Sequence, residues 1–248
     1  MSSELEARKT PATAQELFAA LNDSWVAMFG ERPRKESLIL LMSQWALETG
    51  HGKSMWCYNL GNVKARPTGS YDYCYFACNE LLPTASARSM QAGDPEHAKI
   101  QADRADGNSW IWFYPKHVGC CFRAFRTLVE GAVDHLTIVN KRFSKAWPAV
   151  ILGDVVGYSH ALKIQGYYTA DEAAYTRGVL SVFGQYYKTL ADLQTKGKED
   201  PFDAALYNEA RSLTEFPISR LQDPFEAEES RIIYSPYSVW LETQVEAA

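Results

Sequence analysis

The chain of 248 residues lacks the long hydrophobic run that a membrane span requires. Its first 18 residues also lack the apolar core, flanked by a basic start and a small-residue cleavage site, that marks a secretory signal. Hydrophobic residues nevertheless make up 46% of the chain and aromatic residues 13%, which is enough to build a sizeable core. We therefore expect a globular protein that is made in the cytoplasm and has no membrane span.

The chain also lacks the dense basic stripe of a nucleic-acid binder. Its net charge is −5, yet residues 199–248 hold eleven acidic residues against three arginines, which leaves nineteen acidic and twenty-two basic residues in residues 1–198. A mildly basic body suits an anionic polymer such as a cell wall. A Lys/Gly-rich stretch and a proline separate body from tail. We predict one domain over residues 1–196 and an acidic extension over 197–248 that docks on the domain or on a partner.

The cysteines lack a metal-binding pattern and are odd in number, so they cannot all pair with one another. A zinc site built on these thiols and His117 would need a recognised spacing, and C-x3-C followed by an adjacent pair is not one. Cytosolic synthesis favours reduced thiols. We predict no metal and no cofactor, and interpret the cysteines as small buried residues of a β-rich segment: Cys57, Cys74, Cys78, Cys120 and Cys121.

Apolar spacing predicts helices over residues 12–29 and 36–48, and the second is apolar nearly all round, as in a helix buried within a bundle. The helical period fades over residues 57–122, where alternating aromatic stretches indicate short strands and the polar stretch between them indicates an insertion with a helical turn. Helical spacing resumes over 128–147 and 175–190. The predicted fold class is α+β, mainly α, with a small β lobe.

Glu48 ends the second predicted helix and precedes a loop rich in Gly and Asn. The helix macrodipole disfavours a negative charge at a carboxyl end, and such local conflicts are typical of functional sites. Trp45 and Trp56 are close in sequence, and burial beside aromatic rings raises the pKa of a carboxyl group. A carboxylic acid that stays protonated near neutral pH can protonate a glycosidic oxygen. The alternative is an ordinary surface acid at a helix end.

The stretch "ALETGHGKSMWCYNLGNVKA" around Glu48 resembles the signature of the bacterial β-N-acetylglucosaminidase family of peptidoglycan hydrolases, the flagellar and autolysin type within the lysozyme-like superfamily. That signature is roughly A-x-x-E-S-G-W-G-x-S followed by N-L-F-G-I-K. Thr49 and His51 replace its Ser and Trp, and "NLGN" replaces "NLFG". Two later stretches, "FRAFRTLVEGAVDHLTIVNKRFSKAW" and "ALKIQGYYTADEAAYTRGVLSVF", resemble later segments of the family. The three matches occur in order over residues 36–184.

The resemblance implies a lysozyme-like helical domain whose β lobe flanks a polysaccharide cleft, and cleavage of the β-1,4 glycan strand of peptidoglycan after N-acetylglucosamine. It makes Glu48 the general acid and lets Tyr167 or Tyr175 line the groove beside the reacting sugar. The resemblance also implies a cleft floor that comprises Asn59, Gly61 and Asn62. From the residues themselves, Trp110 and Trp112 share one strand face, either as a sugar platform or in the core of the lobe. His51 is either a loop residue that hydrogen-bonds substrate or an ordinary exposed histidine.

A second carboxylate should activate water, and Glu80 in "YFACNELL" is the favoured residue. Asp72, Asp103 and Asp106 are its competitors, and the substrate's own acetamido group is a further alternative. Two other readings stay open. One is muramidase specificity on the same fold, and the other is a wall-binding or structural module without catalytic activity.

A wall hydrolase without a signal peptide fits a phage lysin, a virion or injection-machine component, or an effector with its own secretion apparatus. Such a protein acts on the wall after lysis, virion assembly or dedicated secretion. The acidic tail would then bind a carrier or an immunity protein.

Overall fold

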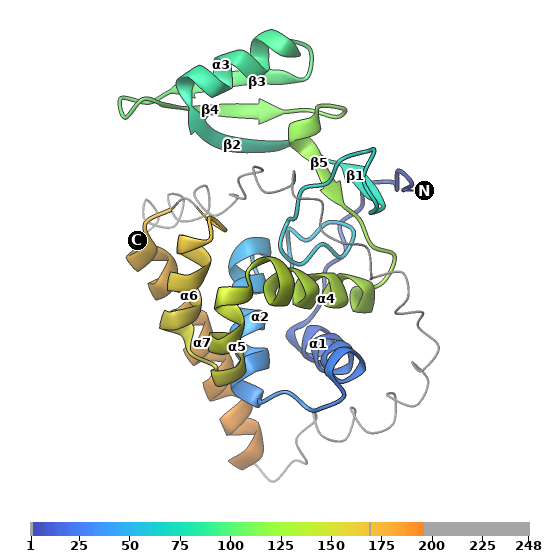
Figure 1. The fold of residues 1–248 in the computed structure, drawn as a ribbon, viewed down its shortest axis with the longest axis vertical. Helices are drawn as coiled ribbons and strands as arrows, with labels where there is room; N and C mark the ends of the chain where they lie inside the picture. The colour runs from blue at the N-terminus through green and yellow to red at the C-terminus, as the bar shows by residue number, and fades with distance from the viewer. Residues whose placement is uncertain (1, 169, 196–248) are drawn as a thin grey trace.

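The structure, a computed structural model, describes residues 2–168 and 170–195. Figure 1 shows a helical body joined to a β lobe, which confirms the α+β, mainly α prediction. The helices of the body are α1 (Ala14–Phe29), α2 (Lys35–Thr49), α4 (Leu128–Thr137), α5 (Trp147–Leu152), α6 (Val155–Ile164) and α7 (Glu172–Thr195). The predicted extension over 197–248 lies outside the described residues. Within those residues, no helix has both the length and the apolar character needed to cross a membrane.

Helix α2 forms the centre of the body, as its sequence predicts. Every residue from Ser37 to Thr49 is buried, and the helix contacts α1, α5 and α7. Helix α1 begins at a capping box formed by Thr13 and Glu16, which satisfies backbone donors that the first turn leaves unpaired. Helix α2 ends where Gly50 adopts a left-handed conformation with φ +57°, so the chain turns sharply just after the last buried turn.

The β lobe contains two small antiparallel sheets. Strands β2 (Cys78–Pro83), β4 (Asn108–Phe113) and β3 (Ala98–Asp103) pair in that spatial order, and β1 (Tyr73–Tyr75) pairs with β5 (Cys121–Arg123). The polar stretch between the aromatic stretches, predicted as an insertion with a helical turn, contains more regular structure than that. That polar stretch forms the ten-residue helix α3 (Thr84–Gly93) and strand β3, because its few apolar residues, such as Ala87 and Ala98, are buried against β4.

The helical spacing over 128–147 does not correspond to one helix, because α4 ends at Thr137. A π-helical turn over Ile138–Arg142 and a 3-10 turn over Ser144–Ala146 follow before α5 begins. Phe143, between these turns, leaves helical geometry with ψ +45°. Its ring then meets that of Tyr167 edge-on at 5.0 Å between centroids. The break therefore turns the chain toward the aromatic residues near Glu48.

A buried ion pair joins the lobe to the body. Arg123 of β5 donates through Nη1 to Oδ1 of Asp134 on α4 at 2.7 Å, and both side chains are almost fully buried. The Arg123 guanidinium also lies 3.7 Å from the centre of the Tyr71 ring. The backbone carbonyl of Arg123 accepts from Nδ2 of Asn59 at 3.0 Å. The β lobe, α4 and the loop after α2 therefore meet at one residue.

Helix α4 approaches that loop more closely than a side chain would allow. A Cβ added at Gly131 would lie 2.0 Å from the carbonyl oxygen of Tyr58 and 2.9 Å from Cδ1 of Leu60. Because the nearest atom belongs to backbone, rotation of a side chain cannot relieve the overlap. Only glycine at this position lets the loop lie against α4.

Replacing Gly131 by alanine should therefore destabilise the protein by about 2–3 kcal/mol, despite the better helix propensity of alanine. Gly184, in the middle of α7, is the matched control because a Cβ there meets nothing within 4 Å. Gly184→Ala should stabilise by roughly 0.5–1 kcal/mol. Urea denaturation of the two variants measures both effects, and equal shifts in the same direction would contradict the close approach.

Candidate active site

Glu48 lies in the last turn of α2, with 6% of its surface exposed. Its backbone carbonyl accepts a hydrogen bond from Nδ2 of Asn62 at 2.6 Å. This bond satisfies one of the carbonyl groups that the end of a helix leaves without a partner. The loop after α2 thus returns across the helix end and covers it, so the acid is not an ordinary surface charge.

Tyrosines from three later segments contact the end of α2. Tyr167 hydrogen-bonds to the carboxyl group of Glu48, and the buried hydroxyls of Tyr158 and Tyr175 are close enough to interact electrostatically with it. The hydroxyl of Tyr158 donates to Oε1 of Gln44, which is one helical turn before Glu48. The ring of Tyr175 stacks on Tyr168, with centroids 3.9 Å apart.

The environment of Glu48 favours the protonated acid. Burial raises the pKa of Glu48 to about 8, although the hydrogen bond from Tyr167 opposes the rise. Among the described residues, no Lys, Arg or His side chain forms an ion pair with this carboxyl group. Burial, and secondarily the charge of Glu48, raises the pKa values of Tyr158 and Tyr175 well above the usual range. Near neutral pH the group is therefore mostly a neutral carboxylic acid that can donate a proton.

The aromatic residues near the acid differ from those that the sequence suggested. Trp45 instead lies against Gly52, and its Nε1 donates to the sulfur of Met55 at 3.5 Å. Trp56 stacks on Phe76 in the lobe, with centroids 4.9 Å apart. The pKa shift comes from burial among tyrosines. Tyr158 and Gln44 were missed, although the position of Gln44, four residues before Glu48, places it on the same helix face.

The three predicted floor residues lie in the loop, each with a distinct role. Asn59 holds the turn closed by donating to the carbonyls of Val63 and Arg123 and accepting from the Val63 amide. Asn62, with φ +49°, is the residue that reaches the carbonyl of Glu48. A Cβ at Gly61 would lie 3.4 Å from the Tyr167 hydroxyl. All three positions thus shape the surroundings of the acid.

His51 contacts α7, and Trp112 contacts a neighbouring strand of the lobe. His51 is exposed, adopts φ +56°, and its Nδ1 lies 3.2 Å from the hydroxyl of Tyr186 on α7. Trp112 donates through Nε1 to Gln101 in the lobe at 2.7 Å. Ile111 and Phe113, which alternate with the tryptophans along β4, are the buried residues, so Trp110 and Trp112 share the more exposed strand face.

Glu80 is a second buried carboxyl group, and it has the cation that Glu48 lacks. Its Oε1 lies 2.9 Å from Nζ of Lys64, which also donates to the carbonyl of Gly119 at 2.6 Å. Burial raises the pKa of Glu80, and Lys64 opposes that rise. Neither Glu48 nor Glu80 perturbs the pKa of the other. The structure thus places the two acids in separate environments and does not bring them together.

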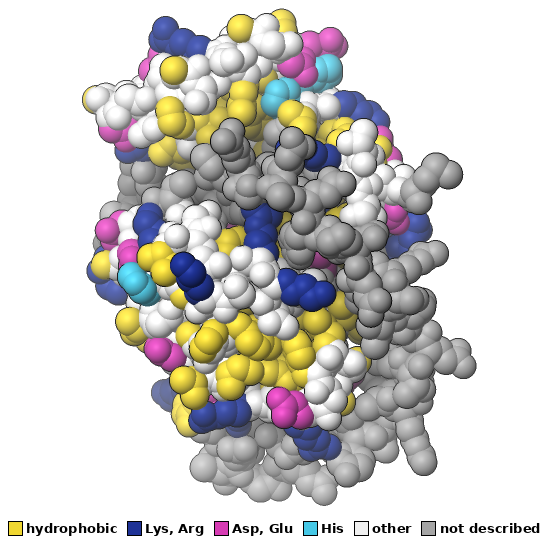
Figure 2. Space-filling model, viewed as in Figure 1, with side chains coloured by type: hydrophobic (Ala, Val, Ile, Leu, Met, Phe, Trp, Pro, Cys, Tyr) yellow, Lys and Arg dark blue, Asp and Glu magenta, His cyan; other side chains and the backbone are white. Residues whose placement is uncertain are grey.

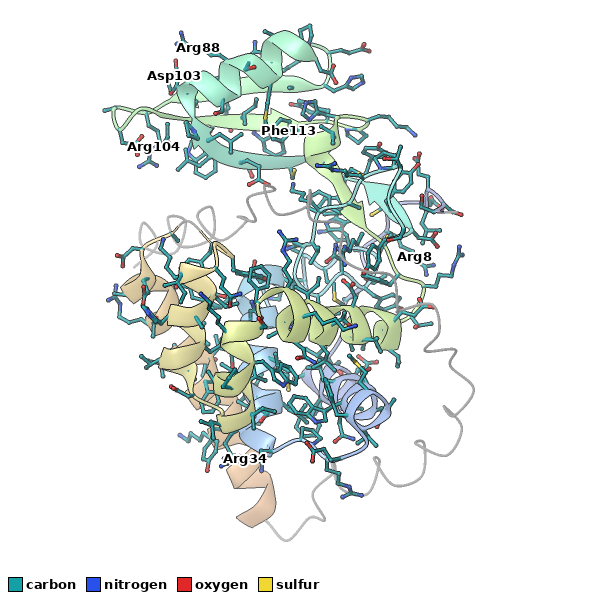
Figure 3. All side chains as sticks on the ribbon, viewed as in Figure 1. Arg8, Arg34, Arg88, Asp103, Arg104 and Phe113 are labelled. Atoms are coloured by element: carbon teal, nitrogen blue, oxygen red, sulfur yellow. The ribbon has the colours of Figure 1, made fainter. Side chains whose placement is uncertain are left out.

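The competing acids are surface residues of the lobe. Asp72 accepts from the Ser3 amide at 2.8 Å, and Asp106 accepts from the Asn108 amide at 3.0 Å. Asp103 pairs with Arg88 at 3.2 Å, and Figure 3 shows both on the side of the lobe that faces away from the body. These two residues help to line a shallow pocket of about 440 Å³ on that side. Over residues 2–168 and 170–195, no three His, Cys, Asp or Glu side chains are grouped to hold a metal ion.

The fold and site together define a two-part α+β domain with a buried, protonated acid at the end of its central helix. No protein-family model matches the chain, and no curated protein matches its sequence. Among solved structures, the chain is similar to the glycoside hydrolase domain of FlgJ from Salmonella typhimurium, with 16% identity and a TM-score of 0.43, over 79% of this chain and 98% of that one. A C-terminally truncated form of the same domain gives 17% identity and a TM-score of 0.40, over 70% and 97%.

The raised pKa of Glu48 makes a prediction about stability. The folded protein binds this proton more tightly than the unfolded chain, so stability is lost as pH rises from about 4.5 toward about 8. Glu48→Gln keeps the shape and cannot ionise. Its free energy of unfolding, relative to that of the native protein, should therefore increase by about 3 kcal/mol between pH 4 and 7.

Urea denaturation at several pH values measures this difference. Glu36→Gln is the matched control for the substitution itself, because Glu36 lies on the same helix and its side chain is 33% exposed. A difference between Glu48→Gln and the native protein that stays constant over this pH range would contradict the raised pKa.

Proposed function

We propose that the protein hydrolyses the β-1,4 glycan strand of peptidoglycan, as an endo-β-N-acetylglucosaminidase with Glu48 as general acid. The observation that carries this proposal is the neutral carboxyl group of Glu48, which is buried among tyrosines and has no counter-charge among the described residues. The proposed substrate class is supported by the sequence, because the stretch around Glu48 and two later stretches resemble peptidoglycan hydrolases in the same order.

In the proposed reaction Glu48 donates its proton to the glycosidic oxygen as the bond to the anomeric carbon breaks. Burial keeps the acid protonated before the step. Afterwards the carboxylate is charged, and the hydrogen bond from Tyr167 stabilises that form. Tyr167 thereby offsets part of the cost of leaving a buried charge. We assign to Tyr175 a place in the wall behind the acid, because it is fully buried and stacked on Tyr168.

Glu80 is the proposed base that activates water. The ammonium of Lys64 at 2.9 Å favours the carboxylate form that a base requires, although burial opposes it. In this proposal the lobe brings Glu80 and its strand toward substrate, with His51 and Trp112 as outer contacts to the glycan. The substrate's own acetamido group is the alternative assistant.

Muramidase specificity is the second candidate for the same site, since protonation by Glu48 serves either bond. A wall-binding module is the candidate from another class, and the ion pair that holds Glu80 in the lobe is the observation that favours it. An anionic wall suits the helical body, where Figure 2 shows Lys and Arg side chains on the face just below the lobe. Delivery by lysis, virion assembly or dedicated secretion, with a carrier or immunity protein bound through residues 197–248, completes the proposal.

The function is tested by digesting purified peptidoglycan with the native protein and with Glu48→Gln. Native protein should release fragments with an N-acetylglucosamine reducing end, identified by mass spectrometry. The substitution should lower the rate at least about 100-fold, because a general acid contributes roughly 10²–10⁴. Glu36→Gln, on the same helix, should leave the rate unchanged.

Other outcomes of this digest are equally informative. Release of fragments with N-acetylmuramic acid reducing ends would support Glu48 as the general acid but would show that the protein is a muramidase. No release by native protein from walls of several sources, together with retained wall binding, would contradict catalysis and favour the binding module.

A further variant tests the base. Glu80→Gln should lower kcat strongly with little change in KM, because water activation acts on the chemical step. Steady-state release of reducing ends gives both constants, and circular dichroism checks that the loss of one partner of a buried ion pair has not unfolded the lobe. An unchanged kcat would show that Glu80 is not the base and would favour assistance by the acetamido group of the substrate.

A further inference from the structure

The cysteines take no part in the proposed reaction, yet two of them meet where the lobe joins the body. Cys57 lies in the loop after α2, and Cys74 lies on β1. Both are buried in the same apolar cluster, and their side chains are in hydrogen-bond contact. All five cysteines of the chain are free thiols. The contact therefore places two oxidisable groups side by side on segments 17 residues apart.

Backbone hydrogen bonds fix both residues in position. The amide of Cys57 donates to the carbonyl of Arg8 at 3.0 Å, and its carbonyl accepts from the amide of Phe125 at 2.9 Å. Cys74 pairs with Phe122 in the β1–β5 ladder. Each thiol therefore extends from a backbone position that hydrogen bonds hold in place.

The two thiols differ in acidity in the way that a nucleophile and its partner do. The hydrogen bond from Cys74 lowers the pKa of the Cys57 thiol to about 6, although burial opposes this. The same contact, and burial, raise the pKa of Cys74. The thiolate is the reactive form in thiol–disulfide exchange. Cys57 is thus the more acidic thiol of the pair and the first to attack, and Cys74 is the group that resolves the intermediate.

A short N-terminal segment, residues 3–10, covers the pair. Sγ of Cys57 lies 3.5 Å from the carbonyl of Glu6. Backbone hydrogen bonds join the segment to Tyr73, Met55 and Cys57. Figure 3 labels Arg8, in the middle of this segment, beside the junction. A terminal segment opens at lower free-energy cost than the core, and opening of this one gives a small oxidant access to the thiol.

We propose that Cys57 and Cys74 form a disulfide when the protein meets a low-molecular-weight disulfide such as oxidised glutathione. The Cys57 thiolate attacks one sulfur of the oxidant, forms a mixed disulfide and releases one glutathione thiolate. Cys74 then loses its proton, attacks Sγ of Cys57 and releases the second glutathione thiolate, so two protein thiols are oxidised as one disulfide is reduced. The released thiolates take up the protons.

The bond would tie the loop of the acid to the lobe. Cys57 precedes Asn59 and Asn62, which hold that loop against Arg123 and the carbonyl of Glu48. Cys74 belongs to the strand at the root of the lobe. Oxidation therefore restrains the lobe relative to the end of α2, whether or not the protein is a hydrolase.

The test uses the full chain carrying Cys78→Ser, because Cys74 and Cys78 otherwise fall in one tryptic peptide, residues 65–88. Serine can keep the contacts of Cys78 with Lys64 and the carbonyl of Gly119. The reduced protein is incubated at pH 7.5 with oxidised or with reduced glutathione, quenched with acid, unfolded with N-ethylmaleimide and digested without reductant. Mass spectrometry then reads the pairing.

Oxidised glutathione should yield peptide 54–64 linked to peptide 65–88, and reduced glutathione should yield both peptides alkylated. Glutathione retained on Cys57 without the link, full alkylation after oxidation, or a link to the peptide that holds Cys120 and Cys121 would each overturn the proposal. The linked protein should also melt higher than the reduced one, by roughly 5 °C. Cys57→Ser should lose that shift, whereas Cys78→Ser should keep it.

Discussion

One close backbone contact holds together the parts of the molecule that surround the acid. Helix α4 passes the carbonyl of Tyr58 with no side chain at Gly131, so the loop after α2 can lie flat against the body. From there Asn59 bonds to the carbonyl of Arg123, whose side chain forms a buried ion pair with Asp134 on the same α4. These contacts fix the loop relative to strand β5 and helix α4. Because the loop covers the end of α2, Glu48 is buried.

The two buried carboxyl groups, Glu48 and Glu80, have different electrostatic surroundings. Glu80 has an ammonium at 2.9 Å, whereas Glu48 has tyrosine hydroxyls and no cation among the described residues. The first arrangement compensates a buried charge, and the second avoids forming one. Environments that separate the behaviour of two acids are the physical basis for giving them different roles. The same comparison explains why an acid at the carboxyl end of α2 is tolerated, since a neutral group does not conflict with the macrodipole.

The parts of the fold that depend on local pattern were predictable. The apolar run before Glu48 indicated a buried helix, and α2 is buried from Ser37 to Thr49. The resemblance pointed to Tyr167, which does contact the acid. Tyr158 could not be found in this way, because its bond to Gln44 joins residues 114 positions apart. The length of α3 and the presence of strand β3 were not predicted, because their residues are mostly exposed and burial against β4 rather than apolar periodicity stabilises them. The break after Thr137 was hidden for the opposite reason, since apolar spacing continues through it.

Helix α7 connects the surroundings of Glu48 with the far end of the body. Tyr175, in its first turns, interacts with Glu48, while Figure 1 shows the helix running away from the lobe to the opposite end of the body. The 20 steps from Tyr175 to Thr195 correspond to roughly 30 Å of helix. A fluorophore at the far end of α7 is therefore remote from the acid. Paired with a second fluorophore in α3, it would report any movement of the lobe as a change in distance.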